Sequence, residues 1–355
     1  MNNIIKITCF LLLIPSIVFA NELKGKHKKT KTIKKEFVVN ANALLELKNR
    51  YGSINIESWN QNKVSLEIII TTSSSKESKA IERLNSITVE FSNSNSHVSA
   101  KTKFGKSKSW SFFNNSSASM DIKYIVRMPE SNKLNINMDY GNVFIDKITG
   151  NSDIDIDYGK LIADELLGNT NIINLDYSRG SSIEKLVNAS INIDYSTIDI
   201  SDAGIIDLNS DYCTSTFGKV KDLTFNADYG SIRVEKSDNI DGNSDYVSLK
   251  FGKIANSLRI DADYGSLKIA EMGENFSKIS LDLGYTGVKM GIHKNSSFNY
   301  IIDSKYGGIT LPNNVNNTKE ITKNTSKHFE GSYNGSKGRV SIISKYGSVK
   351  ITTNE

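Results

Sequence analysis

Residues 191–200 read Ile-Asn-Ile-Asp-Tyr-Ser-Thr-Ile-Asp-Ile, so apolar and polar side chains alternate on both sides of Tyr195. This period of two is typical of a β-strand with one buried face and one wet face. Because successive side chains of a strand point to opposite faces, the isoleucines are predicted to lie inside and the Asn, Asp and Thr outside. The segment therefore predicts two short strands joined by a turn at the tyrosine.

The same unit returns along the chain at spacings of 17 to 21 residues. It is centred on these tyrosines: Tyr140, Tyr158, Tyr177, Tyr195, Tyr212, Tyr229, Tyr246, Tyr264, Tyr285 and Tyr306, with similar units around Tyr51 and Tyr346. A unit this short cannot bury its own apolar face, whereas stacked units share one core. The repeat predicts an all-β fold: a single-stranded parallel β-solenoid, or right-handed β-helix, of about ten coils. An antiparallel sandwich is the competing architecture, and the constant phase of the units favours the solenoid.

The turn of each unit has its own residue preferences. A glycine follows the tyrosine in several units: Gly141, Gly159, Gly230, Gly265, Gly307 and Gly347. Glycine fits a corner that needs positive φ, so we expect such a corner there. We expect the tyrosines to stack inside the rod, and an exposed tyrosine track for carbohydrate is the alternative.

The first twenty residues have the layout of a secretory signal peptide, with an apolar run from Ile7 to Phe19 that ends in small residues. They predict cleavage after Ala20 and export to the periplasm or the bacterial cell surface. No segment reaches the ~20 apolar residues of a transmembrane helix. Cys9 lies within the apolar run rather than at the cleavage point, which argues against a lipid anchor. Cleavage leaves Cys213 as the only cysteine, so no internal disulfide is expected.

The formal net charge of +5 is concentrated near the N-terminus. Residues 21–36 hold seven lysines against Glu22 and Glu36, and we expect a disordered arm there, with attraction to acidic lipid or polysaccharide as the alternative. The rest of the chain is close to neutral. Nucleic acid is therefore not an expected partner.

Residues 37–130 depart from the repeat and predict a small mixed N-terminal cap before the repeat domain of residues 131–353. Within the cap we expect strands at 64–72, 87–91, 98–103 and 120–128 and a helix at 76–84. A Ser-, Asn- and Lys-rich loop is expected at 105–119, and a second loop at 313–338. The first carries Trp110, Phe112 and Phe113, which either dock on the body or stay exposed for a partner, and the second covers the last edge.

Two polar columns run along the predicted outer surface. Directly before the tyrosines stand Asp139, Asp157, Asp176, Asp194, Asp211, Asp228, Asp245 and Asp263. Two residues earlier stand Asn137, Asp155, Asn174, Asn192, Asn209, Asn226, Asn243, Asp261, Asp282 and Asp303. The candidate ligand-binding strip is Asp157, Asp176, Asp194, Asp211, Asp228, Asp245 and Asp263 with Asn192, Asn209 and Asn226.

The strip has a structural and a functional interpretation. In the first, each Asp accepts a backbone N–H in an Asx-turn, the amides form a ladder, and basic residues at Arg233, Lys250, Lys268 and Lys289 face part of the strip. In the second, the strip binds Ca²⁺, a cationic partner or a sugar. The repeat lacks the glycine-rich nonapeptide of calcium-binding β-rolls, so no cofactor is predicted and Ca²⁺ is the alternative.

The sequence carries no signature of a catalytic site. Its four histidines are isolated, and it has no Gly-x-Ser-x-Gly motif and no metal-spaced His pair. An active site normally interrupts a repeat, and nothing distinguishes one Asp pair from the others. We expect that the protein is not an enzyme; a polysaccharide-acting enzyme on a β-helix scaffold is the alternative.

The units Tyr-Gly-Ser-Ile-Asn-Ile at 51–56, Asp-Tyr-Gly-Ser-Leu-Lys-Ile at 263–269 and Ser-Lys-Tyr-Gly-Ser-Val-Lys-Ile at 344–351 carry a family resemblance. With the signal peptide, they resemble the putative-adhesin family of exported bacterial β-strand-repeat (β-solenoid) proteins, over residues 45–353. The resemblance implies a β-solenoid outside the cytoplasm and brings no catalytic or ligand residues with it. We therefore expect a non-catalytic, adhesin-like envelope or cell-surface protein that binds a glycan or another envelope component.

Overall fold

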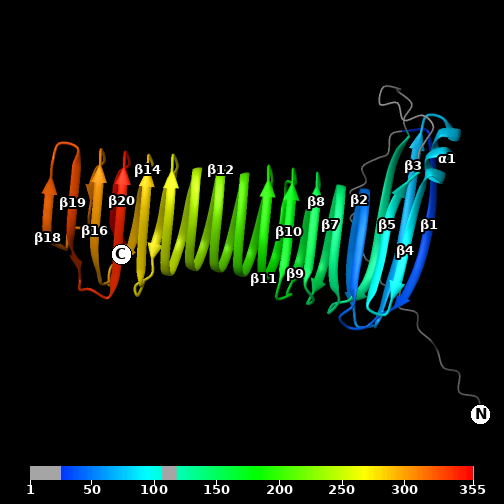
Figure 1. Cartoon of the computed structure of the whole chain (residues 1–355), viewed down its shortest axis with the longest axis horizontal. Coiled ribbons are helices and arrows are strands. Elements are labelled where there is room, and N and C mark those ends of the chain that lie inside the picture. The colour runs from blue at the N-terminus through cyan, green and yellow to red at the C-terminus, as the bar shows by residue number, and fades with distance from the viewer. Residues whose placement is uncertain (1–24, 106–117, 355) are drawn as a thin grey trace, which may run out of the picture.

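The structure is a computed structural model that describes residues 25–105 and 118–354. It is all-β apart from one helix, and its strands are stacked along one long axis (Figure 1). The predicted signal peptide and the aromatic residues Trp110, Phe112 and Phe113 lie outside the described residues. No helix in the described part of the chain is long and apolar enough to cross a membrane.

The repeat region forms two stacks of parallel strands. Its elements are β7 (Lys133–Ile148), β8 (Ser152–Asp157), β9 (Lys160–Leu166), β10 (Asn171–Asp176), β11 (Ser181–Asp194), β12 (Thr197–Asp263), β13 (Ser266–Met272), β14 (Lys278–Gly284), β15 (Gly287–His293), β16 (Phe298–Lys305) and β17 (Ile309–Thr310). β7, β8, β10 and β11 pair in parallel so that Asp157 is opposite Asp176 and Asp176 is opposite Asp194. β9 pairs in the same way with the second half of β7 and the first half of β11. Residues that the repeat places in one column are therefore directly opposite each other in paired strands.

The inward side chains of both stacks share one hydrophobic core, as the alternation predicts. Ile191 and Ile193 from one strand and Ile198 and Ile200 from the next are all buried in it. Because both stacks face this core, their outward sides point in opposite directions. We call the outward side of the strands before the tyrosines the strip face, and that of the strands after the tyrosines the reverse face.

The tyrosines lie at the corner between the two faces, and they point outward. Tyr195 has φ 50°, and every ladder tyrosine has positive φ, between 50° and 64°. Simple alternation would place the tyrosine inside with Ile193, but the left-handed residue turns the chain and directs its own side chain to solvent. Tyr195 is 43% exposed and Tyr177 is 51% exposed. The expectation of an internal tyrosine stack is therefore wrong.

The residue after the tyrosine is turned inward, and of the six glycines expected to need positive φ only Gly230 has it, at 159°. A Cβ on Gly159 would lie 1.8 Å from the carbonyl oxygen of Gly141 in the preceding coil, so close approach excludes a side chain. Where Ser178, Ser196 and Cys213 replace glycine, the side chain is buried. Each then joins a ladder: Ser178 N donates to Ser196 Oγ at 2.9 Å and Ser196 N to Cys213 Sγ at 3.2 Å.

The N-terminal part contains one coil of the stack and a set of strands that cover its first edge. The elements are β1 (His27–Val38), β2 (Leu44–Trp59), β3 (Lys63–Ser74), α1 (Glu77–Ser86), β4 (Ile87–Ser94), β5 (His97–Phe104) and β6 (Ser119–Pro129). β2 pairs in parallel with β7 on one side and with β5 and β6 on the other. β4 and β3 then add antiparallel strands to β5 and β6. The predicted helix and four cap strands are present, with ends shifted by a few residues.

Residues 27–38 form strand β1, so the disordered arm expected at 21–36 is wrong for this part. β1 pairs antiparallel with β3 over its whole length. Ile33 and Phe37 pack against the core, and Lys31 Nζ donates to the carbonyl oxygen of Leu84 at 3.0 Å. The remaining lysines of β1 are typical of an edge strand, because charged side chains there oppose pairing with a strand of another molecule.

The C-terminal part departs from chain order. It comprises β18 (Val315–Thr322), β19 (Ser326–Tyr333), β20 (Gly338–Lys345) and β21 (Val349–Asn354). β20 lies between β14 and β16 and pairs in parallel with both (Figure 1). β18 and β19 form an antiparallel hairpin on the other side of β16, which is the edge cover expected of the loop at 313–338.

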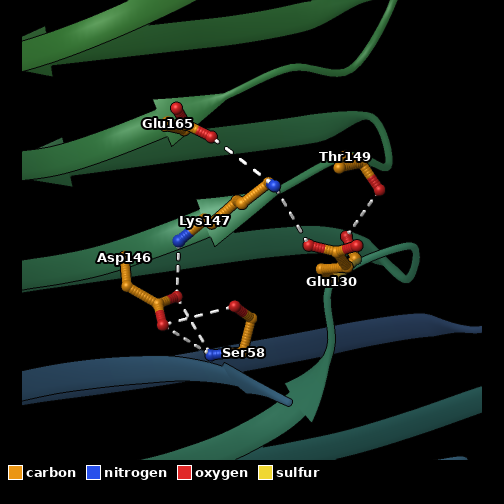
Figure 2. A network of polar contacts seen from close by, with 6 residues as sticks. All are labelled: Ser58, Glu130, Asp146, Lys147, Thr149 and Glu165. Atoms are coloured by element: carbon orange, nitrogen blue, oxygen red, sulfur yellow. Dashed lines mark hydrogen bonds and ion pairs between the residues drawn. The ribbon is translucent and has the colours of Figure 1, made fainter. Parts of the chain in front are cut away.

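Charged side chains join β2 to the first coils of the repeat. Figure 2 shows the Asp146 carboxylate accepting hydrogen bonds from Ser58 N at 2.9 Å, while Lys147 Nζ lies 3.4 Å from Glu130 and 3.7 Å from Glu165. Each carboxylate here has a hydrogen-bond or ion-pair partner. On the strip face, Arg259 pairs with Asp241 at 2.8 Å, whereas no ion pair within the described residues involves the predicted strip carboxylates from Asp157 to Asp263.

Candidate functional site

The strip face carries a shallow groove of about 410 Å³ over four successive coils. Six of the ten predicted strip residues line it: Asp176, Asp194, Asp211, Asn192, Asn209 and Asn226. Asp157 precedes them in register, and Asp228, Asp245 and Asp263 continue the column through the following coils. The structure therefore brings the predicted strip together on one surface.

The amide column forms the predicted ladder in its central part. Asn192 Nδ2 donates to Asn174 Oδ1 at 2.9 Å, and Asn209 Nδ2 donates to Asn192 Oδ1 at 2.9 Å. Nearer the N-terminus, Asn137 Nδ2 donates to Asp155 Oδ2 at 3.0 Å. Each of these amides still has hydrogen-bonding capacity toward solvent, because an Asn side chain has two N–H donors and two acceptor lone pairs.

The aspartate side chains do not form the expected Asx-turns. The corner N–H groups bond instead to main-chain carbonyls of the next coil, as in Tyr177 N to Asp194 O at 3.0 Å and Tyr195 N to Asp211 O at 3.0 Å. The carboxylates remain at the surface. Among the described residues, no ion pair reaches the strip from Asp157 to Asp263; only Asp139, one rung earlier, has a cation, with Arg50 Nε at 3.4 Å.

The electrostatic environment of the column raises the pKa of several of its carboxyl groups. The pKa values of Asp157, Asp176, Asp211 and Asp245 lie above the usual aspartate value. Partial burial is the largest cause at each, and the charges of neighbouring aspartates in the column add to it. A cation or a hydrogen-bond donor placed over the column would relieve both effects.

The predicted basic counterpart lies on the reverse face, away from the strip. Lys250, Lys268, Lys289 and Lys350 occupy adjacent rungs in register. All four are exposed, and no ion pair involves them in the described part of the chain. Arg233, one rung earlier, pairs with Glu235 at 2.7 Å. The expectation that this basic column faces the acidic strip is wrong, because the core separates the two faces.

The exposed tyrosines form one continuous ladder beside the strip. Tyr177, Tyr195 and Tyr212 stack with centroids 4.9–5.0 Å apart and planes within 1° of parallel. Since each ring is covered on both sides by its neighbours, the ladder presents ring edges and phenol hydroxyls to solvent. Arg50 lies beside the first two rings, 5.3 Å from the centroid of Tyr51 and 5.5 Å from that of Tyr140, and Lys305 lies 5.4 Å from the centroid of Tyr306. The sequence shows the column but not the left-handed backbone that exposes it.

Three histidines, His97, His293 and His328, each lie within 4 Å of a carboxylate, and His328 contacts two. His328 Nδ1 lies 2.7 Å from Asp303 and Nε2 lies 2.6 Å from Glu330, which raises the pKa of the imidazole. Both ring nitrogens are engaged, so neither is free to take a proton from a substrate. The cluster holds β19 to β16. No group of three potential metal ligands is found among residues 25–105 and 118–354.

Solved structures of three bacterial proteins are similar to this chain. A putative cell adhesion protein from Clostridium sporogenes is 12% identical over 91% of this chain and 100% of its own, with a TM-score of 0.20. Putative adhesins from Parabacteroides distasonis (11% identity, 76% and 95% coverage, TM-score 0.33) and Bacteroides fragilis (11%, 91% and 97%, 0.22) follow. No family model and no curated protein matches the chain. The names of the three proteins agree with the family that the repeat resembles, and the function proposed below is argued from this chain's own surface.

Proposed function

We propose that this chain is an exported, non-catalytic, adhesin-like protein of the bacterial envelope or cell surface, built as a right-handed parallel β-solenoid. Its strip face binds a glycan or another envelope component. The observation that carries this proposal is the row of carboxylates from Asp157 to Asp263, which have no cationic partner among the described residues and lie beside an exposed tyrosine ladder. The signal-like N-terminus supports export.

The chemistry of the surface favours a ligand with repeated hydrogen-bond donors. Carboxylates accept hydrogen bonds, and the Asn amides and phenol hydroxyls both donate and accept. These groups recur with the rung spacing of about 4.8 Å. A sugar cannot stack on the ring faces inside the ladder, because neighbouring rings cover them. Hydroxyl groups of a glycan would instead bond to the strip and the phenol edges, with Ca²⁺ as a bridge to acidic sugars.

A binding screen against glycans and envelope fractions, with and without Ca²⁺, tests this proposal. The test variant changes Asp194, Asp211 and Asp228 to Asn on the strip face. The matched control changes Asp164, Asp199 and Asp202, which are exposed elsewhere, so that the change in charge is the same.

We expect saturable binding by the wild type and the control and weaker binding by the strip variant. Equal binding by all three proteins would exclude the strip as the binding surface. Product formation from a glycan would contradict the non-catalytic part and favour a polysaccharide-acting enzyme.

A further inference from the structure

Two columns of opposite charge lie on opposite faces of the same rod. The strip face carries the carboxylates from Asp157 to Asp263, and the reverse face carries Lys250, Lys268, Lys289 and Lys350. No ion pair within the described residues involves any of these side chains. In each column, like charges follow one another from rung to rung, which is unfavourable until ions of the opposite sign approach.

The two columns have the same period. Both are made by consecutive coils of one repeat, so both follow the strand spacing of about 4.8 Å. The tyrosine ladder between them has the same spacing, with centroids 5.0 Å apart for Tyr246 and Tyr264 and 4.8 Å for Tyr264 and Tyr285. A row of ammonium groups on one rod can therefore face a row of carboxylates on a second rod, with one ammonium group opposite each carboxylate.

We propose that this protein associates side by side with a second copy of itself, the reverse face of one rod lying on the strip face of the next. This partner goes beyond the ligand proposed above. A second copy is the occupant to which both charge and period are matched, whereas an unrelated cationic partner would share only the charge.

The geometry of this contact makes it open-ended. The strip face of one copy meets the reverse face of the other, so each added copy leaves one free strip face and one free reverse face. The lysines lie toward the C-terminal end of the acidic column, so full overlap requires a shift of the rods along their axes. The contact relies on exposed charges and is therefore weakened by salt.

Sedimentation velocity on the mature chain, at low and high salt and over a range of concentrations, tests this inference. One variant changes Lys250, Lys268 and Lys289 to Glu, which makes both faces acidic, and a second changes the same lysines to Gln. A third changes Asp194, Asp211 and Asp228 to Lys, which makes both faces basic. The control changes Lys294, Lys323 and Lys337 to Glu, exposed positions outside the column with the same change in charge.

We expect the wild type and the control to associate at low salt and to dissociate at high salt. The Lys→Glu, Lys→Gln and Asp→Lys variants should each remain monomeric, and the acidic and basic variants should associate when mixed. Circular dichroism confirms that each variant is folded.

A wild type that stays monomeric at low salt, or a Lys→Glu variant that associates like the wild type, would overturn the inference. So would a control that loses association, or a mixture that stays monomeric. Ligand binding by dilute, monomeric protein is measured separately, so the two proposals can fail independently.

Discussion

Tyr285 stacks on Tyr346, with ring centroids 4.5 Å apart, although Tyr306 is the next ladder tyrosine along the chain. Tyr306 stacks on the other side of Tyr346 at 4.8 Å. The coil around Tyr306 therefore stands one rung further out than chain order would place it. The last segment of the chain, β20 and β21, fills the rung between.

The inserted coil predicts a defined effect of truncation. Ending the chain after Lys337 removes β20 and β21, so β14 and β16 each lose the partner between them. We expect faster amide hydrogen exchange in β14–β19 and unchanged exchange in β7–β11, because each coil contacts only its neighbours. Hydrogen exchange with mass spectrometry measures this. Unchanged protection of β16 in the truncated protein would contradict the order of the coils.

Much of the architecture follows from local pattern. The period of two identifies the inward residues, and the constant phase of the Asp and Asn positions identifies the rungs, because equivalent positions of stacked coils coincide. The repeat says nothing of the order in which coils stack, since every coil presents a similar edge. That is why the place of Tyr346 was not predictable, whereas the neighbours of Tyr195 were.

The candidate strip was predictable and its surroundings were not. Alternation places Asp194 and Asn192 outside, and the structure agrees. The outward direction of Tyr195 depends on one backbone torsion angle, and a bulky residue at positive φ is uncommon. The lysine-rich strand β1 was predicted as disordered because composition outweighed the weak alternation of Ile33 and Phe37.

Adjacent glycines at one corner give a matched test of close packing. A Cβ on Gly307 would lie 1.9 Å from the carbonyl oxygen of Gly347, whereas a Cβ on Gly308 would meet nothing within 4 Å. We expect Gly307→Ala to lower the free energy of unfolding by about 1–3 kcal/mol. Gly308→Ala should change it by less than about 0.5 kcal/mol. Urea unfolding measures both, and equal effects would contradict the close approach of the two coils.

The left-handed tyrosines predict an unusual ranking of substitutions. Changing Tyr212 to Ala removes two ring stacks and keeps a Cβ at φ 54°, so we expect a loss of about 2 kcal/mol in the free energy of unfolding. Tyr212→Gly should lose about 0.5–1 kcal/mol less, because glycine adopts positive φ without strain. Urea unfolding of the two variants provides the comparison. If Tyr212→Ala were more stable than Tyr212→Gly, backbone strain at position 212 would not determine the ranking.

His328 predicts a pH dependence of the C-terminal hairpin. Asp303 and Glu330 raise the pKa of the imidazole, and His328 and Lys319 lower the pKa of Glu330. The histidine's contribution is complete below its unfolded pKa of about 6.5 and is lost as pH rises through the higher folded value. We expect β18 and β19 to exchange amide hydrogens faster when the pH is above the folded pKa of His328, after correction for the intrinsic pH dependence of amide exchange. His328→Ala should remove this dependence; its persistence would assign it to another group.

The acidic column predicts that removing one charge stabilises the protein. Burial and the neighbouring charges of Asp194 and Asp228 raise the pKa of Asp211 by more than a hydrogen bond from the Asp228 backbone lowers it. A carboxyl group with a raised folded pKa favours the folded state below its unfolded pKa of about 3.9, and this contribution is lost as pH rises through the folded value. At pH 7 the ionised Asp211 therefore opposes folding.

We expect Asp211→Asn to increase the free energy of unfolding at pH 7 by about 1 kcal/mol, the order of repulsion from neighbours about 4.8 Å away in water. The gain should shrink below pH 4 and with added salt, because protonation and screening both remove the repulsion. Asp199→Asn, on the reverse face, is the control and should change stability little. Thermal unfolding across pH 3–7 measures the effect. A destabilised Asp211→Asn variant at pH 7 would mean that the carboxylate makes a favourable contact in the folded protein, and the column would then be structural rather than free to bind a partner.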